Sequence, residues 1–588
     1  MLTMNNCGIE IRRVVEYSAL FPNEKPLDVI KVLKTFNRLE VIRCATLVSL
    51  HYGNMPFPNP EKTLFSKISD KHMKYLNGCF EKYFQRIRLP QNGKVQLVTN
   101  RTGLELFRLI LGIQPSEFKG TIKDEDKEFM LFKIITSLNE KIMSFQNGNN
   151  ALKLDELTFL NSYLTNDLNN FVFKSCMSNQ MLLFYKLTDF IPTNEVLTKA
   201  QAVLFDKWGI KSWKEYFGTL MYLANETNKY YVNSLHGFPI INVRKISEHC
   251  EEGLFSSSLV EEMSIGVDEY IPCEENENLR SLNADYRQFR AKPFIKISED
   301  EYAAINIELV CERIYNSLCF DFQPLIKSKK DGVGFFDYNK DFVEKELFRK
   351  SLWHCFHSSY ITFPSKNVVS KHEDKNEPDF YARKFENILL FECKAIKMNG
   401  LIRDNGNYAK LLDDLHEKIV EKTRELDSTR RQFTGAPIPI GIGQLIHHID
   451  SIEEDEFKWD DNIPDSVVYY PILVLEDARF MQPGLLSIVN RWFYEQLEKH
   501  NRLSVESINC RPVMVLSIPT LLFYDKFIKR RGLVNLIDAF LCKKSVQMPN
   551  GVYLVEPLAD FDSYIRSFSH RKEDILNKYF KEWLERNL

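Results

Sequence analysis

The sequence has few of the features that mark membrane, secreted or zinc-ribbon proteins. Its 588 residues contain no stretch that approaches about 18 consecutive apolar residues, and the N-terminus lacks an apolar segment of signal-peptide type. The 12 cysteines are scattered singly from Cys7 to Cys542, and none belongs to a C-x-x-C pair. This argues against a zinc ribbon and a disulfide framework. We therefore expect a cytoplasmic protein with reduced thiols and no membrane segment.

A strong overall charge is also missing, since the formal net charge is -3 and the pI is near 6.5. This excludes a protein that coats nucleic acid through a general positive charge, so any contact with nucleic acid would need local patches. Each candidate patch, taken alone, is typical of a solvated surface cluster. Three fall in or beside the C-terminal region: Lys327, Lys329 and Lys330; Arg430 and Arg431; and Lys529, Arg530 and Arg531.

No P-loop, G-x-S-x-G element or protein-kinase signature is present, which argues against those enzyme classes. Core material is ample, because 44% of the residues are hydrophobic and 13% are aromatic. A chain of this length is too long for one core, and at about 150 residues per domain it suggests two to four domains.

The pattern of apolar residues divides the chain into three parts. Residues 1–250 show mainly helical spacing and predict a helical domain for assembly or for access to a partner or target. Residues 251–330 begin with a stretch rich in Glu, Ser and Asn, then predict a strand, a polar turn and a second apolar run. We interpret them as a connector and a small α+β adaptor. Residues 331–588 alternate strand and helix patterns, which is typical of an α/β domain with a partly parallel sheet.

One short segment of the α/β part combines an acid and a base at the end of a strand. Ile388 to Phe391 form an apolar run, followed directly by Glu392-Cys393-Lys394. With a period of two, Glu392 and Lys394 share one face of the strand and Cys393 lies on the other. Upstream, Asp379 begins a second strand-like piece, and a polar turn would bring it near Glu392 in a hairpin. Two carboxylates and a lysine at one sheet edge suit a hard divalent cation.

These residues resemble the PD-(D/E)xK nuclease superfamily, which includes many restriction and repair nucleases. Pro378-Asp379, 12 further residues and then Glu392-Cys393-Lys394 match its motif, and the resemblance covers about residues 335 to 520. It implies a restriction-endonuclease-like domain with a mixed sheet flanked by helices. The expected order is a helix at 341–352, strands at 360–363, from 379 and at 388–394, a helix at 408–431, a strand at 469–475, a helix at 485–497, a strand at 513–518 and a helix at 521–528.

The resemblance also implies site residues and a cofactor. Mg²⁺ or Mn²⁺ would bind Asp379, Glu392, the backbone carbonyl of Cys393 and a glutamate on the first helix. For that glutamate we expect Glu344, with Glu346 as the alternative. Lys394 would orient a water molecule or neutralise charge on the phosphate. In several branches of the superfamily, a glutamine on the helix after the E-x-K strand has an accessory role in the active site. This makes Gln444 a further candidate.

Other polar groups carry less information. The acidic segment 450–461 is typical of a solvated loop. The pairs His354/His357 and His447/His448 lack the partners of a zinc site, and we interpret them as core or surface residues.

The sequence thus predicts a metal-dependent nuclease with double-stranded DNA as the favoured substrate. By analogy it would act as a bacterial restriction or anti-phage effector. We further expect a dimer or higher oligomer built through residues 1–250. Two alternatives stay open: a helical scaffold or interaction protein with an inactive nuclease-like domain, and a nuclease that cleaves RNA.

Overall fold

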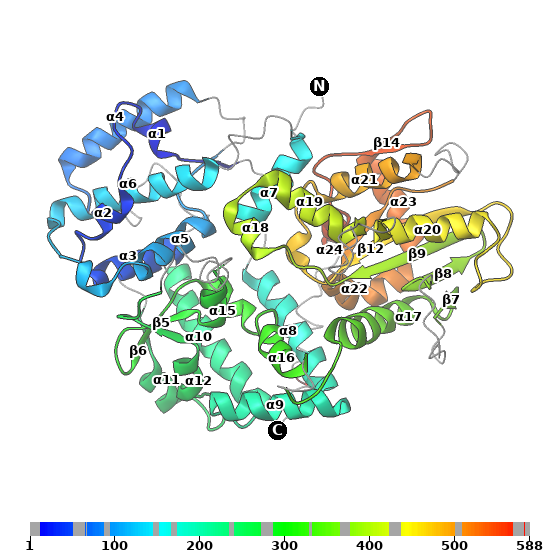
Figure 1. Cartoon of the computed structure of the whole chain (residues 1–588), viewed down its shortest axis with the longest axis horizontal. Helices are drawn as coiled ribbons and strands as arrows, with labels where there is room; N and C mark the ends of the chain where they lie inside the picture. The colour runs from blue at the N-terminus through cyan, green and yellow to red at the C-terminus, as the bar shows by residue number, and fades with distance from the viewer. Residues whose placement is uncertain are drawn as a thin grey trace, which may run out of the picture.

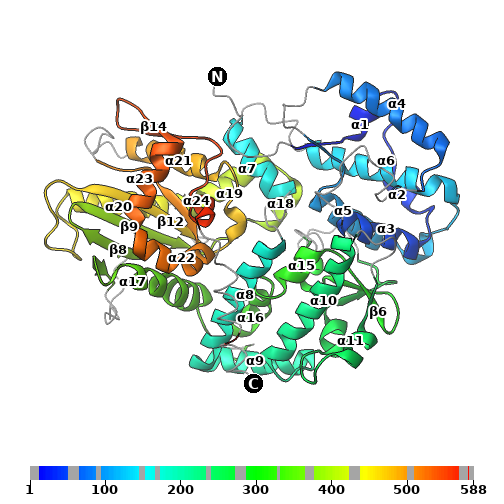
Figure 2. The same cartoon turned by 180° about the vertical axis from the view of Figure 1, so that it is seen from behind.

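The computed structural model describes residues 12–50, 65, 67–87, 94–144, 152–165, 173–233, 240–271, 286–327, 332–364, 377–422, 437–499, 509–568 and 581. Within these ranges the N-terminal half is rich in helices and the C-terminal part is an α/β region (Figures 1 and 2). This confirms the predicted division at the level of fold class. None of the helices in the described ranges is long and apolar enough to cross a membrane.

The first lobe of the molecule, blue in Figure 1, packs around a hydrophobic core to which residues between 265 and 309 also contribute. Helix α5 is typical of its construction. Thr99 and Thr102 exchange hydrogen bonds at its N-terminus in a capping box, and the helix buries most of its residues. The elements are β1 Arg12–Val14, α1 Tyr17–Leu20, α2 Val29–Leu33, α3 Arg38–Leu50, α4 Asp70–Arg86, β2 Lys94–Gln96, α5 Asn100–Leu111 and α6 Asp124–Met143.

Residues 154–326 contribute a second group of helices and a small mixed sheet. The sheet has the order β3-β6-β5-β4, and its β5–β6 hairpin is the strand and turn predicted near residue 294. The strands are β3 Ile241–Asn242, β4 Ser264–Gly266, β5 Phe294–Lys296 and β6 Glu301–Ala304. The helices are α7 Leu154–Thr165, α8 Phe173–Phe190, α9 Glu195–Trp208, α10 Trp213–Asn233, α11 Val243–His249, α12 Ser257–Glu262, α14 Arg287–Ala291, α15 Ile307–Glu312 and α16 Leu318–Ile326.

The C-terminal region is built on a five-stranded sheet with the order β13-β12-β9-β8-β7. The β7-β8-β9 meander is antiparallel, whereas β9, β12 and β13 run parallel. The strands are β7 Ile361–Phe363, β8 Phe380–Lys384, β9 Asn387–Lys394, β12 Val468–Leu475 and β13 Met514–Ser517. Continuous apolar sequence in β9 and β12 agrees with strands that are covered on both faces.

Helices cover both faces of this sheet, with α20 and α21 on one side and α17 and α22 on the other (Figure 1). The helices predicted at 485–497 and 521–528 are present as α21 and α22. The elements are α17 Lys350–Phe356, α18 Gly400–Asn405, α19 Tyr408–Ile419, α20 Ile442–Glu453, α21 Leu485–Lys499, α22 Ile518–Arg531, α23 Leu533–Lys544 and α24 Phe561–Ser567, with short strand pairs β10 Glu421–Lys422 and β11 Ile438–Pro439, and β14 Ser545–Gln547 and β15 Tyr553–Val555.

Two predicted helix boundaries were wrong. The helix expected at 341–352 begins at Tyr338, is capped by Asp337 rather than Asp341, and winds as a π-helix, η7 (Tyr338–Arg349), before α17 continues it. The helix expected at 408–431 ends at Ile419, and β10 follows at Glu421. Residues 423–431 of that prediction lie outside the described ranges.

The larger hydrophobic core extends from Phe159 to Ile565. It therefore joins helices of the N-terminal half to the C-terminal sheet across residue 330. The division at that residue stays a prediction, but the core on its two sides is continuous.

Candidate active site

The β8–β9 hairpin brings the predicted acid and base residues together. Phe380 pairs with Phe391, so Asp379 lies at the strand end beside Glu392. The Asp379 carboxylate accepts a hydrogen bond of 2.8 Å from the Cys393 backbone N–H. Lys394 Nζ lies 2.9 Å from Glu392 Oε2 and 3.6 Å from Asp379 Oδ2. The two carboxylates that the motif singled out therefore converge on the Lys394 ammonium group.

The two carboxylates of this cluster are in different electrostatic states. Burial opposes ionisation of Glu392, but Lys394 and a hydrogen bond from His448 outweigh it and lower the Glu392 pKa to about 2. Burial and the neighbouring charge of Glu392 instead raise the pKa of Asp379 well above its usual range, and Lys394 does not compensate. Asp379 is thus a desolvated carboxylate with too little positive charge beside it.

Lys394 is held as a cation. Burial alone would lower its pKa, but Glu392 and Asp379 together raise it above the ordinary lysine value. At neutral pH the ammonium can therefore stabilise negative charge, and it has no free lone pair with which to accept a proton from water.

Of the two glutamates expected on the first helix, Glu344 faces the cluster. Burial raises its pKa, which also responds to the charges of Arg349, Lys394 and Glu392. Arg349 forms an ion pair with Glu344, with 2.7 Å between Nη2 and Oε1. Glu346 instead pairs with the exposed Lys350, one helical turn further along the chain.

Helix α20 adds a residue that the sequence pattern did not single out. The side chain of His448 is 2% exposed, and its Nε2 lies 3.0 Å from Glu392 Oε1. The ring orients the carboxylate from the side opposite Lys394. His448 could have been found from its position four residues after Gln444, because this spacing places both side chains on one face of α20. Gln444 itself accepts a hydrogen bond from the Gly441 N–H and closes the start of the helix.

The donor set fits a hard divalent cation better than a softer metal. In the described part of the chain no group of three or more His, Cys, Asp or Glu side chains has the spacing of a metal centre. Mg²⁺ needs only one or two protein carboxylates, since water and substrate oxygens complete its shell. Asp379 and Glu392 can supply these together with the Cys393 carbonyl. The Cys393 thiol is buried in the core as expected, and burial raises its pKa.

The predicted basic patches lie at different places. Lys529, Arg530 and Arg531 are exposed at the C-terminal end of α22. Lys327 follows α16 on the surface, whereas Lys329, Lys330, Arg430 and Arg431 lie outside the described residues. The nine cysteines that the structure describes are all free thiols.

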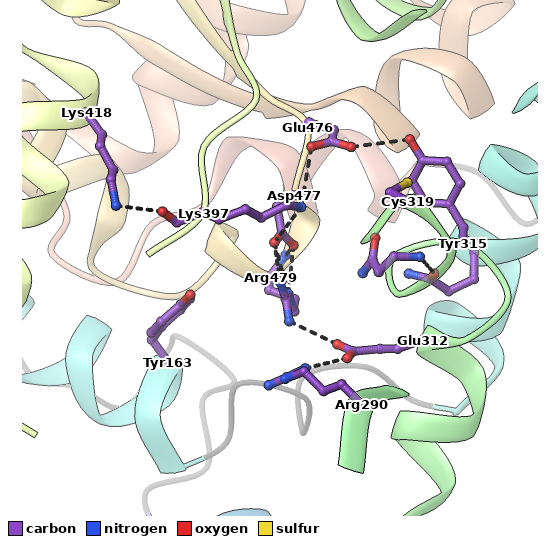
Figure 3. Close-up of polar contacts among 12 residues, drawn as sticks. Tyr163, Arg290, Glu312, Tyr315, Cys319, Lys397, Lys418, Glu476, Asp477 and Arg479 are labelled. Atoms are coloured by element: carbon purple, nitrogen blue, oxygen red, sulfur yellow. Dashed lines mark hydrogen bonds and ion pairs between the residues drawn. The ribbon is translucent and has the colours of Figure 1, made fainter. Parts of the chain in front are cut away.

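A second polar cluster lies at the same edge of the sheet, and here the charges are matched (Figure 3). Asp477 is the second residue after β12 and accepts three hydrogen bonds of 2.6 to 3.0 Å from Arg479. Arg479 also donates to Glu312 of α15 at 3.0 Å. Lys397 lies 3.2 Å from Asp477 and 3.4 Å from Glu476.

This buried cluster, which we call the ion-pair network, links α15 to the edge of the five-stranded sheet. Arg290 completes it through Glu312, and Tyr315 donates to Glu476 at 3.3 Å. Although Asp477 is buried, Arg479 and Lys397 hold its pKa well below the usual range.

Comparison with protein-family models, with curated proteins and with solved structures finds no match for this chain. The assignment of a function therefore depends on the geometry and chemistry of the site.

Proposed function

We propose that this protein is a metal-dependent nuclease that hydrolyses phosphodiester bonds, with a C-terminal domain of the restriction-endonuclease-like PD-(D/E)xK type. The observation that carries the proposal is the convergence of Asp379 and Glu392 on Lys394 Nζ, at 3.6 and 2.9 Å. The antiparallel meander followed by parallel strands supports it, because this order places the motif at the carboxyl end of β9.

Asp379, Glu392 and the Cys393 carbonyl would hold Mg²⁺ or Mn²⁺, with Glu344 as an additional oxygen donor. A bound divalent cation supplies a water of lowered pKa as nucleophile at neutral pH. The negative charge of Asp379 is only partly neutralised, because Lys394 Nζ lies 3.6 Å away and is shared with Glu392 at 2.9 Å, so the pair of carboxylates favours a bound cation.

The residues of the chain have separate parts in this reaction. Lys394, held as a cation, donates to the negative charge that develops on the phosphate in the transition state. His448 donates to Glu392 and keeps its carboxylate in one orientation. Burial of the cluster strengthens each of these contacts, because water screens them less.

Nucleic acid, with double-stranded DNA favoured, is the proposed substrate. The exposed cations at 529–531 offer one local surface for its backbone. The chain as a whole is near neutral, so we also propose a homo-oligomer through the N-terminal half, which would multiply such patches. Defence against phage is the role that we propose by analogy.

A cleavage assay tests the proposal. Purified protein is incubated with plasmid DNA and with structured RNA in Mg²⁺, in Mn²⁺ and in EDTA. The expected result is cleavage that needs the metal and is lost in Asp379→Ala. Absence of cleavage on both substrates, together with no Mn²⁺ binding, would favour the non-catalytic scaffold.

A further inference from the structure

Arg349 occupies an unusual place beside the candidate site. Its guanidinium forms an ion pair with Glu344 at 2.7 Å and lies 3.9 Å from Glu377. Both carboxylates belong to the elements of the site, because Glu344 faces the catalytic cluster and Glu377 immediately precedes Pro378-Asp379. The Nε atom of Arg349 is buried and has no hydrogen-bond partner among the described residues.

The π-helical winding of η7 creates this contact. In an α-helix, residues five apart point about 140° away from each other. In a π-helix the repeat closes at i+5, so Glu344 and Arg349 share a face. Single π-helical turns are frequent at functional sites, and here the winding turns a cation toward the site that α-helical geometry would direct elsewhere.

The site carries more negative than positive side chains. An anionic ligand can therefore bind at Arg349 only after a cation has bound. Among the described residues, the carboxylates of Glu344, Glu377, Asp379 and Glu392 face the cations of Lys394 and Arg349. A divalent cation would balance these charges. The site could then accept the negative charge of a phosphodiester.

We infer that Arg349 is a phosphate-binding residue of this site, and that Glu344 holds its guanidinium where a phosphodiester oxygen of the substrate binds. This inference rests on the proposed nuclease function. A guanidinium is a planar fork of five N–H donors that fits phosphate as well as carboxylate. A phosphate oxygen can therefore replace Glu344 as acceptor, and the unpaired Nε can donate to the same group.

The experiment measures binding separately from cleavage. Fluorescent duplex DNA is titrated with the Lys394→Ala protein in Mn²⁺, with and without Arg349→Gln, at several salt concentrations. An RNA duplex of the same sequence distinguishes the two sources of phosphodiester. We expect Arg349→Gln to weaken binding of whichever duplex the parent binds by about tenfold, and to reduce the salt slope by about 1. Arg349→Lys should recover part of the affinity through its charge.

Lys345→Ala is the matched control, because Lys345 lies on the same helix, is half exposed and pairs with Asp341 at 2.8 Å. It should bind as the parent does. Thermal melting of each variant checks the fold, and Mn²⁺ titration checks the metal site. Unchanged duplex binding and an unchanged salt slope in Arg349→Gln would overturn the inference alone. A wild-type protein that neither binds Mn²⁺ nor cuts either duplex would overturn the proposed function and this inference with it.

Discussion

Two buried aspartates at one edge of the same sheet differ in what surrounds them. Asp477 receives Arg479 and Lys397, and its pKa is held well below the usual range. Burial and Glu392 raise the pKa of Asp379, and Lys394 does not compensate. In the ion-pair network three carboxylates, Glu312, Glu476 and Asp477, meet three cations, Arg290, Arg479 and Lys397.

The difference indicates what each cluster is for. Buried charges that are fully matched hold two parts of a protein in a fixed arrangement, at a cost in desolvation. Buried charges that are not matched destabilise the fold and persist where a ligand supplies the missing charge. The ion-pair network therefore positions α15 against the edge of the sheet, whereas we propose that the Asp379 cluster binds a cation.

The largest effect is expected in the ion-pair network. Asp477→Asn leaves Arg479 and Lys397 without their main acceptor, and should lower the free energy of unfolding at pH 7 by about 3–5 kcal/mol. Urea unfolding measures this. Because the folded-state pKa of Asp477 lies below that of the unfolded chain, its stabilisation is present at neutral pH and is lost as the pH falls below about 4.

Asp538→Asn serves as the control for that variant. Asp538 makes an ion pair with Arg511 at 3.2 Å but is half exposed, so its loss should cost less than about 1 kcal/mol. Equal losses of unfolding free energy in the two variants would mean that the ion-pair network stabilises the fold no more than a surface ion pair does.

The next effect concerns the two lysines, three residues apart, that belong to the two clusters. Lys394→Ala should reduce the cleavage rate by about 10²–10³-fold, equivalent to about 2.7–4 kcal/mol of transition-state stabilisation. Lys397→Ala should lower stability but leave the rate per folded molecule nearly unchanged. Initial rates at matched concentrations of folded protein measure both, and equal rates in the two variants would place the catalytic lysine elsewhere.

The smallest expected effect is a change in stability at Asp379. Asp379→Asn removes an uncompensated buried carboxylate, so it should stabilise the metal-free protein by about 1 kcal/mol while abolishing cleavage. Thermal melting in EDTA measures the gain. A clear loss of stability would show that Asp379 already has its partners, as Asp477 does.

Much of the C-terminal region could be predicted from local sequence. The apolar runs of β9 and β12 and the motif at Asp379, Glu392 and Lys394 were sufficient to place strands and site residues, because alternation along a strand fixes which side chains share a face. Glu344 was chosen over Glu346 from the resemblance together with helical spacing, and its role as a metal ligand stays a prediction, although its helix winds differently from the expectation.

The remaining features depend on contacts between distant segments. His448 reaches Glu392 across 56 residues, and Arg479 reaches Glu312 across 167. No local pattern encodes such pairs, so His448 was interpreted as an ordinary core or surface histidine. The π-helical winding that brings Arg349 to Glu344 is also set by packing, since neither residue has an unusual local preference.

The central claim is that the Asp379 cluster binds a divalent cation, and calorimetric titration with Mn²⁺ tests it most directly. The account predicts saturable binding to the wild-type protein, loss of binding in Asp379→Asn, and unchanged binding in Glu346→Gln, whose carboxylate pairs with Lys350 instead. Bound Mn²⁺ at about 100 times its Kd should also stabilise the fold by about 2.7 kcal/mol. No binding to the wild-type protein, or equal binding to Asp379→Asn, would contradict the account.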